Sequence, residues 1–313
     1  MSGILVLGIT IIAYYFIIFA KNVKKSIITF FFGILLFILK PVEGLEFENL
    51  GRIVSFETLG ILLGMMIIVE ILKESGFFTF AAVNAINPTP LMLLTIAIDN
   101  IGGMSTLIGS PLNIVLGSIG GLDFTTFLIK MLPITVLSFI SAIFIFKVNN
   151  KIDSKLFNEK LKTLSSMDPE KTIENKSLMY KGVIVFAIVL TGFIFHSKIK
   201  IDLALIALAG ALILMLLTQK DFESMSKDLD WDTMFFYGGL FTIAFSLEEI
   251  GVTQAIANLF NPLIDTPMIL MLVIMWISAF VIPFLSAVPG TLILAPVIKL
   301  LVLHGAPFEL WYA

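Results

Sequence analysis

The sequence predicts an all-α polytopic membrane protein with about nine to ten transmembrane segments in two inverted-topology repeats with interrupted helices. The composition is the first reason: 58% of the 313 residues are hydrophobic, only 14% are charged, and the mean hydropathy is +1.04. A soluble domain carries about 25% charged residues. The second reason is a series of long apolar runs, and the third is an internal repeat.

Apolar runs of helical length mark the spans, because a helix needs roughly 20 apolar residues to cross hydrocarbon. Residues 76–86 are too short for a crossing, so we expect them to lie at the membrane interface. The expected spans are 3–20, 26–40, 57–73, 91–118, 124–147, 179–197, 201–218, 232–249 and 267–285, with a further apolar stretch at 290–303.

The distribution of basic residues predicts the orientation. Eight of the twenty Lys and Arg residues lie between Lys147 and Lys181, and basic residues near span ends stay in the cytoplasm. Residues 148–178 are therefore a cytoplasmic linker between a first half, 1–147, and a second half, 179–313. The N-terminus is then outside, and the expected location is the cytoplasmic (inner) membrane of a bacterium or archaeon.

Residues 56–76 resemble residues 231–251, so the repeat units begin at about 56 and about 231. By counting crossings, the first copy runs from outside to inside and the second copy runs the other way. Repeats of opposite orientation are the usual device for alternating access in secondary transporters. The identical pairs include Thr58/Thr233, Gly64/Gly239, Leu72/Leu247, Glu74/Glu249 and Gly76/Gly251.

An interrupted helix is predicted within the span 91–118. Glycine pairs tolerate unwound backbone, Pro111 removes a helical donor, and unwound backbone at this depth must line a cavity or be buried in protein. An acid such as Asp99 at this depth needs a cation, a proton or a polar partner. In the alternative interpretation, Asp99 lies at a water interface and the glycines form an ordinary turn. The candidate binding residues in this stretch are Asp99, Asn100, Gly102, Gly103, Ser105, Thr106, Ser110 and Asn113.

Residues 101–118 and 60–78 resemble the ion transporter superfamily, in the branch of arsenical pump membrane proteins and sodium–proton antiporters with a citrate-transporter-like domain. Residues 231–241 and 247–251 resemble the start of that family's second half. The resemblance implies a re-entrant hairpin and a broken helix in each half, with the substrate held between their tips. Ser286 and Thr291 are the candidate binding residues in the second half.

The sequence departs from this family in both halves. Asp99 and Asn100 run directly into Ile101 and the glycine pair, and the chain stops before a second broken helix. We therefore expect that one copy does not form a complete transport pathway. We expect instead either a homo-oligomer that shares its sites between copies, or a chain that inserts into the membrane without transporting.

Secondary active transport of small inorganic ions is the function expected from this resemblance, as arsenite or antimonite efflux or as sodium–proton antiport. Alternating access would occur around residues 99–113, coupled to a proton or sodium gradient, with a possible sodium ion at Asp99. The alternatives are a di- or tricarboxylate transporter of the citrate type and a shortened, non-transporting membrane paralogue.

Several other classes are excluded by missing residues. There is no cysteine, no Gly-rich phosphate-binding loop and no HExxH motif. Ser105 lacks a plausible histidine partner, and no basic run is interleaved with aromatic residues as in nucleic-acid binders. We therefore expect no enzyme activity, no cofactor, no bound metal other than the sodium ion considered at Asp99, and no nucleic-acid partner. The expected partners are a small ion and the lipid bilayer.

Overall fold

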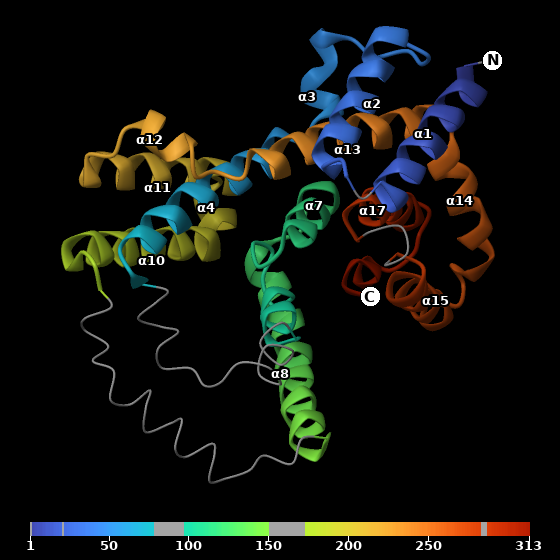
Figure 1. Cartoon of the computed structure of the whole chain (residues 1–313). Helices are drawn as coiled ribbons and strands as arrows, with labels where there is room; N and C mark the ends of the chain where they lie inside the picture. Colours follow the sequence, from blue (N-terminus) through green and yellow to red (C-terminus); the bar gives the residue numbers. More distant parts are fainter. Residues whose placement is uncertain (1, 21, 78–96, 150–172, 283–286) are drawn as a thin grey trace. The chain divides into compact units, whose positions relative to one another are not determined.

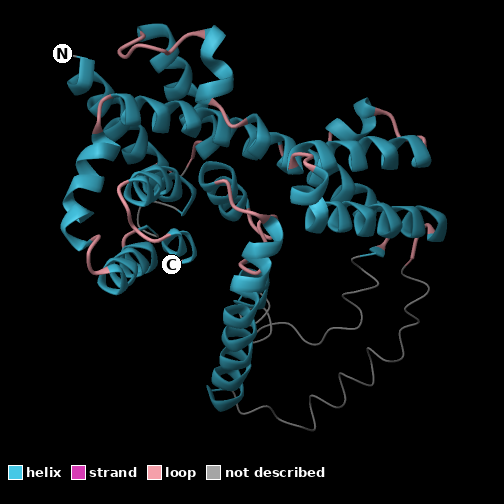
Figure 2. Cartoon of the chain, turned by 180° about the vertical axis from the view of Figure 1, so that it is seen from behind, coloured by secondary structure: helices cyan, strands magenta, loops and turns pink. Residues whose placement is uncertain are grey.

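A computed structural model describes the chain except for residues 1, 21, 78–96, 150–172 and 283–286. Within the described ranges the secondary structure is helical throughout, with turns and loops between the helices (Figure 2). This confirms the all-α class. The expected interfacial segment 76–86 and most of the linker 148–178 fall outside the described residues.

The chain divides into two compact units, and Figure 1 labels the helices that belong to them. The first unit contains residues 1–59, 111–122 and 230–313, and the second contains residues 60–110 and 123–229. Each unit takes residues from both sequence halves. The division into halves at 147 and 179 concerns the sequence repeat and stays a prediction.

The first unit contains most of the helices. They are α1 (Ser2–Phe19), α2 (Lys25–Leu39), η1 (Phe47–Asn49), α3 (Leu50–Ile53), the first turn of α4 (Phe56–Glu74), α7 (Pro111–Gly120), α13 (Trp231–Glu249), α14 (Val252–Phe260), η3 (Asn261–Leu263), α15 (Pro267–Phe280), α17 (Ala287–Leu303) and η4 (Phe308–Tyr312).

Close contact between α2 and α13 organises the first unit. A Cβ atom on Gly33 would lie 3.0 Å from the Cα atom of Gly239, and a Cβ atom on Gly239 would collide with the backbone of Thr29. Small residues at a crossing let two helix backbones approach, which is how helices associate where lipid removes the hydrophobic driving force. Thr29 itself is fully buried, and its hydroxyl donates to the carbonyls of Lys25 and Ser26 at 3.1 Å.

The second unit holds the rest of α4, a helical segment at 97–103, α8 (Phe124–Asn149), α10 (Lys176–Ile199), α11 (Leu203–Thr218) and α12 (Phe222–Ser226). Here α4 crosses α11 in the same manner. A Cβ atom on Gly64 would lie 2.6 Å from the carbonyl carbon of Ala207. Gly64 and Gly239 are the repeat-related glycines, so both copies use the same position for a tight helix crossing.

The two repeat copies share further local structure. Both helices are 19 residues long and end on the repeat-shared acid, Glu74 in α4 and Glu249 in α13. Gly76 and Gly251 follow with φ of 81° and 82°, a left-handed conformation that glycine adopts without strain.

The starts of α4 and α13 are capped in the same way. The amide of Thr58 donates to the Ser55 hydroxyl at 3.2 Å, and the amide of Thr233 donates to the Asp230 carboxylate at 3.1 Å. A side-chain acceptor at this position satisfies an amide that has no partner within the helix. The residues that the two sequence copies share therefore occupy matching structural positions.

Three described helices, α1, α8 and α10, are long and apolar enough to cross a membrane, or up to five spans if each of two bent helix pairs counts as one. The apolar helices α2, α7, α11, α15 and α17 are shorter, and they coincide with others of the predicted spans. Many large apolar side chains of α8 are exposed, as a lipid-facing surface requires. The chain is an integral, polytopic membrane protein.

Candidate functional site

The predicted helix break has a clear local structure. Residues 97–103 are helical, residues 104–110 form turns, and α7 begins at Pro111. The hydroxyl of Ser105 donates to the carbonyl of Gly102 at 2.6 Å. Gly103 and Gly109 approach so closely that a Cβ atom on Gly103 would lie 2.8 Å from the carbonyl oxygen of Gly109. The glycines therefore permit the compact turn that separates the two helical segments.

The candidate residues of this break fall in both units. Residues 99–110 belong to the second unit, where Asp99, Asn100 and Gly102 are exposed. Asn113 in α7 and Thr291 in α17 belong to the first unit, and the Thr291 hydroxyl donates to the carbonyl of Ala287 at 2.9 Å. Ser286 lies outside the described residues. A single site formed by all ten residues stays a prediction.

A cavity of about 530 Å³ lies within the first unit. Its wall is formed by α3, the start of α4, the end of α7, the end of α13 and the middle of α17, where Pro296 interrupts the helical hydrogen bonds. Pockets for small molecules usually measure about 300–1,000 Å³, so this cavity has the size of a substrate site. Its polar lining residues are Arg52, Ser55, Glu57, Ser118, Glu248, Glu249 and Lys299.

Hydroxyl groups connect two parts of the cavity wall. The Ser55 and Ser118 hydroxyl oxygens lie 2.9 Å apart, and Ser118 also donates to the Glu57 carboxylate at 3.0 Å. Ser118 lies near the end of α7, whereas Ser55 caps the start of α4. These bonds hold the Glu57 carboxylate in place at the cavity wall.

Arg52 is held from two sides. One terminal guanidinium nitrogen lies 3.4 Å from Oε1 of Glu249, and the guanidinium carbon lies 5.8 Å from the centroid of the Phe245 ring. Lys299, from α17, is the other base in the wall and is exposed. Arginine suits planar recognition of carboxylates because its guanidinium can form two parallel hydrogen bonds. The cavity therefore offers two cationic groups and three carboxylates.

At the start of α13, Asp232 also has partners. Its carboxylate accepts a hydrogen bond from the Ser26 hydroxyl at 2.9 Å and forms an ion pair with Lys24. The hydrogen bond to Asp232 and the charge of that carboxylate raise the pKa of Lys24 above its ordinary value. The acids at both ends of α13 are thus paired with basic side chains from the N-terminal part of the chain.

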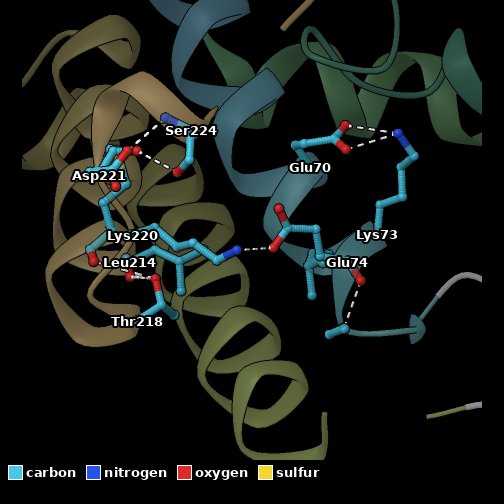
Figure 3. A network of polar contacts seen from close by, with 11 residues as sticks. Glu70, Lys73, Glu74, Leu214, Thr218, Lys220, Asp221 and Ser224 are labelled. Carbon is cyan, nitrogen blue, oxygen red and sulfur yellow. Dashed lines mark hydrogen bonds and ion pairs between the residues drawn. The ribbon is translucent and has the colours of Figure 1, made fainter. Parts of the chain in front are cut away.

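The counterpart of Glu249 lies in the second unit. Glu74 at the end of α4 points toward Lys220, which follows α11, and their charged atoms are 2.5 Å apart (Figure 3). Beside them, the Lys73 ammonium lies 2.8 Å from the Glu70 carboxylate. The Asp221 carboxylate accepts from the Ser224 amide at 2.6 Å and caps α12, and the hydrogen bonds from Ser224 lower the pKa of Asp221.

The cavity is the feature that the sequence did not predict. In the sequence, Glu248 and Glu249 stand at the end of the expected span 232–249, and nothing links them to Arg52 or Lys299. One signal was present, because Glu74 and Glu249 are identical in the two repeat copies. The ion pair between Glu249 and Arg52 forms only in the folded chain, because the two residues are far apart in the sequence.

Apolar helices around a charged cavity of substrate size fit a membrane transporter. The family comparison agrees with this class: the family model of the citrate transporters, CitMHS, matches residues 80–313. The chain belongs to this family, which confirms the resemblance to the ion transporter superfamily. The matched range includes the cavity residues of α7, α13 and α17, whereas Arg52 and Glu57 precede it.

Individual relatives cover most of this chain, and some of them are named as transporters. An uncharacterized transporter of Mycobacterium tuberculosis is 25% identical, in an alignment that covers 83% of this chain and 73% of the relative. The magnetosome protein MamN of Magnetospirillum gryphiswaldense is 30% identical over 234 residues, which cover 73% of this chain and 53% of that protein. The chain is thus a transport protein, similar over most of its length to proteins named as transporters.

Proposed function

We propose that the protein is a secondary transporter of polycarboxylate anions of the citrate class, located in the cytoplasmic membrane and driven by a proton or sodium gradient. The observation that carries the proposal is the pair of bases, Arg52 and Lys299, on the wall of one cavity of about 530 Å³ in a member of the citrate transporter family. A polycarboxylate needs cationic anchors, and these two come from different helices. In this proposal Asp99, beside the helix break, takes the coupling ion.

The carboxylates of the cavity support a second candidate, transport of a small inorganic ion. Glu57, Glu248 and Glu249 outnumber the two bases in the wall, and carboxylate oxygens are suitable ligands for a hard cation. Sodium–proton antiport is the form of inorganic transport that this observation favours. Arsenite or antimonite efflux would instead depend on the hydroxyl and amide groups of residues 100–113.

A substrate panel in proteoliposomes separates these candidates. Purified protein would be reconstituted and tested with citrate, sodium, lithium and arsenite under an imposed pH gradient. We expect saturable citrate flux that is abolished when the gradient is collapsed. Flux of sodium or arsenite without citrate would replace the polycarboxylate assignment with the inorganic one. An absence of flux for all four substrates would favour the non-transporting paralogue.

A further inference from the structure

Glu249 is placed to compete with a substrate carboxylate for Arg52, an inference that rests on the proposed function. Arg52 belongs to the short helix α3, and Glu249 is the last residue of α13. Both residues line the cavity of about 530 Å³. The contact joins one terminal nitrogen of Arg52 to one oxygen of Glu249 at 3.4 Å. It is thus a single, long contact rather than the two-bond arrangement that arginine forms with a well-placed carboxylate.

The pair is weak enough to exchange. The Arg52 side chain is 75% exposed and that of Glu249 is 30% exposed. Exposed ion pairs favour the paired state by only about two- to five-fold. A carboxylate that bonds both terminal nitrogens of Arg52 would therefore replace Glu249 readily. The exchange conserves charge at Arg52, because one carboxylate leaves as another arrives.

Arg52 also keeps a support when Glu249 leaves. Its guanidinium lies over the ring of Phe245, 5.8 Å from the centroid, and this attraction does not depend on Glu249. Phe245 itself is buried, at 7% exposure, so the ring is a fixed platform. Lys299 lines the same cavity, and among the residues that the structure describes it forms no ion pair. A second carboxylate of the substrate therefore has a cationic group available.

We propose that Glu249 occupies, on Arg52, the position of a carboxylate of the transported polycarboxylate, and that substrate binding displaces it. Arg52 is then a substrate-binding residue and Glu249 sets the apparent affinity. Glu249 is a built-in competitor, so its removal strengthens substrate binding, whereas the removal of Arg52 weakens it.

The test compares Glu249→Gln with Glu248→Gln in the purified full chain. Glu248 is a matched control, because it is the neighbouring acid on the same cavity wall and its loss removes the same charge. Citrate binding would be measured by calorimetry in detergent. We expect a Kd about two- to five-fold lower in Glu249→Gln than in Glu248→Gln, and a Kd at least about ten-fold higher in Arg52→Gln than in wild type. The double variant Arg52→Gln/Glu249→Gln should bind no better than Arg52→Gln.

The outcomes separate this inference from the proposed function. Equal affinities in Glu249→Gln and Glu248→Gln, with normal binding by wild type, would overturn the competition and leave the transporter assignment intact. A wild-type protein that binds no citrate, although it is monodisperse, would overturn both. Arg52→Lys keeps the positive charge but loses the planar guanidinium that can form two parallel hydrogen bonds. This variant provides a second test if Arg52→Gln does not fold. It should lose affinity for citrate, and unchanged affinity in Arg52→Lys would contradict two-bond recognition.

Discussion

The ends of α4 and α13 compare the same repeat position in the two units. Each helix ends at the repeat-shared glutamate, and each glutamate forms an ion pair with a base from another segment. Glu74 and Lys220 are 2.5 Å apart and about equally shielded, at 31% and 32% exposure. Glu249 and Arg52 are 3.4 Å apart, and Arg52 is 75% exposed. The tighter pair fixes one helix end, whereas the looser pair borders a cavity and remains available to a ligand.

The largest expected effect concerns the repeat-shared glycines at the helix crossings. Gly239→Val would force a side chain into the backbone of Thr29, and Gly64→Val would force one into Ala207. Overpacking of this kind costs about 3 kcal/mol. We expect both variants to lose most of their monodisperse protein in size-exclusion chromatography.

Gly238→Val is the matched control for the crossing in α13. Gly238 has no atom within 4 Å of a built Cβ, and the substitution introduces the same side chain one residue away in the same helix. It should remain close to wild type in yield and Tm. If Gly238→Val and Gly239→Val were equally damaging, the close approach of α2 and α13 would not be the cause.

The next prediction compares the two ion pairs directly. A double-mutant cycle of Glu74→Gln with Lys220→Gln should give a coupling energy of about 0.5–1 kcal/mol, and a cycle of Arg52→Gln with Glu249→Gln should give about 0.2–0.5 kcal/mol. The physical reason is the shorter distance and lower exposure of the first pair. Thermal unfolding of purified protein in detergent measures both. A larger coupling for Arg52 and Glu249 would contradict the view that this pair is the exchangeable one.

The smallest expected effect is the pH dependence of the contact between the start of α8 and the end of α10. Partial burial alone would raise the pKa of Asp123, but hydrogen bonds from Ser197 and Thr126 outweigh it and lower that pKa below its ordinary value. His196 also lies close, with Nε2 3.8 Å from the Asp123 carboxylate. A lowered pKa stabilises the fold above the ordinary aspartate pKa of about 4, and this stabilisation is lost as the pH falls through the folded value.

Thermal unfolding between pH 3 and pH 6 tests whether the stability falls as the pH is lowered. Wild type should lose stability toward the acid end, and Asp123→Asn should show less of that loss because the titrating group is gone. Asp202→Asn serves as a control, since that acid precedes α11 and its side chain forms no cap there. An acid loss of the same size in Asp123→Asn would remove this carboxylate from the explanation.

The positions of the helices could be predicted from the sequence, because the length of an apolar run and the glycine or proline residues that interrupt it are local properties. The break between residues 103 and 111 was predicted from Gly102, Gly103 and Pro111, and the structure has turns there. The repeat-shared Gly64 and Gly239 were identified by sequence alone, although their role as helix crossings needed the fold. The cavity was not predicted, because Arg52 and Glu249 are far apart in the sequence and each resembles an ordinary charge near a span end.

Asp99, Asn100, Gly102, Gly103, Ser105, Thr106, Ser110, Asn113, Ser286 and Thr291 remain predicted binding residues. The structure shows turns at residues 104–110, between the helical segment 97–103 and α7. The substrate was harder to predict than the helix break, because the two cationic anchors, Arg52 in α3 and Lys299 in α17, are brought to one cavity only by the fold. In the sequence, Lys130 and Lys299 are both isolated bases within apolar segments, and nothing distinguishes one from the other.

These two lysines allow the most direct test of the central claim, that the first-unit cavity binds a polycarboxylate. Lys299 lines that cavity, whereas Lys130 lies in α8, in the second unit. Citrate counterflow would be measured in proteoliposomes containing wild type, Lys299→Gln or Lys130→Gln. We expect the KM for citrate to rise by about ten-fold or more in Lys299→Gln, because a charge-assisted contact is lost, and to stay near the wild-type value in Lys130→Gln. Equal KM values in the two variants, or no citrate exchange by the wild type, would contradict the account.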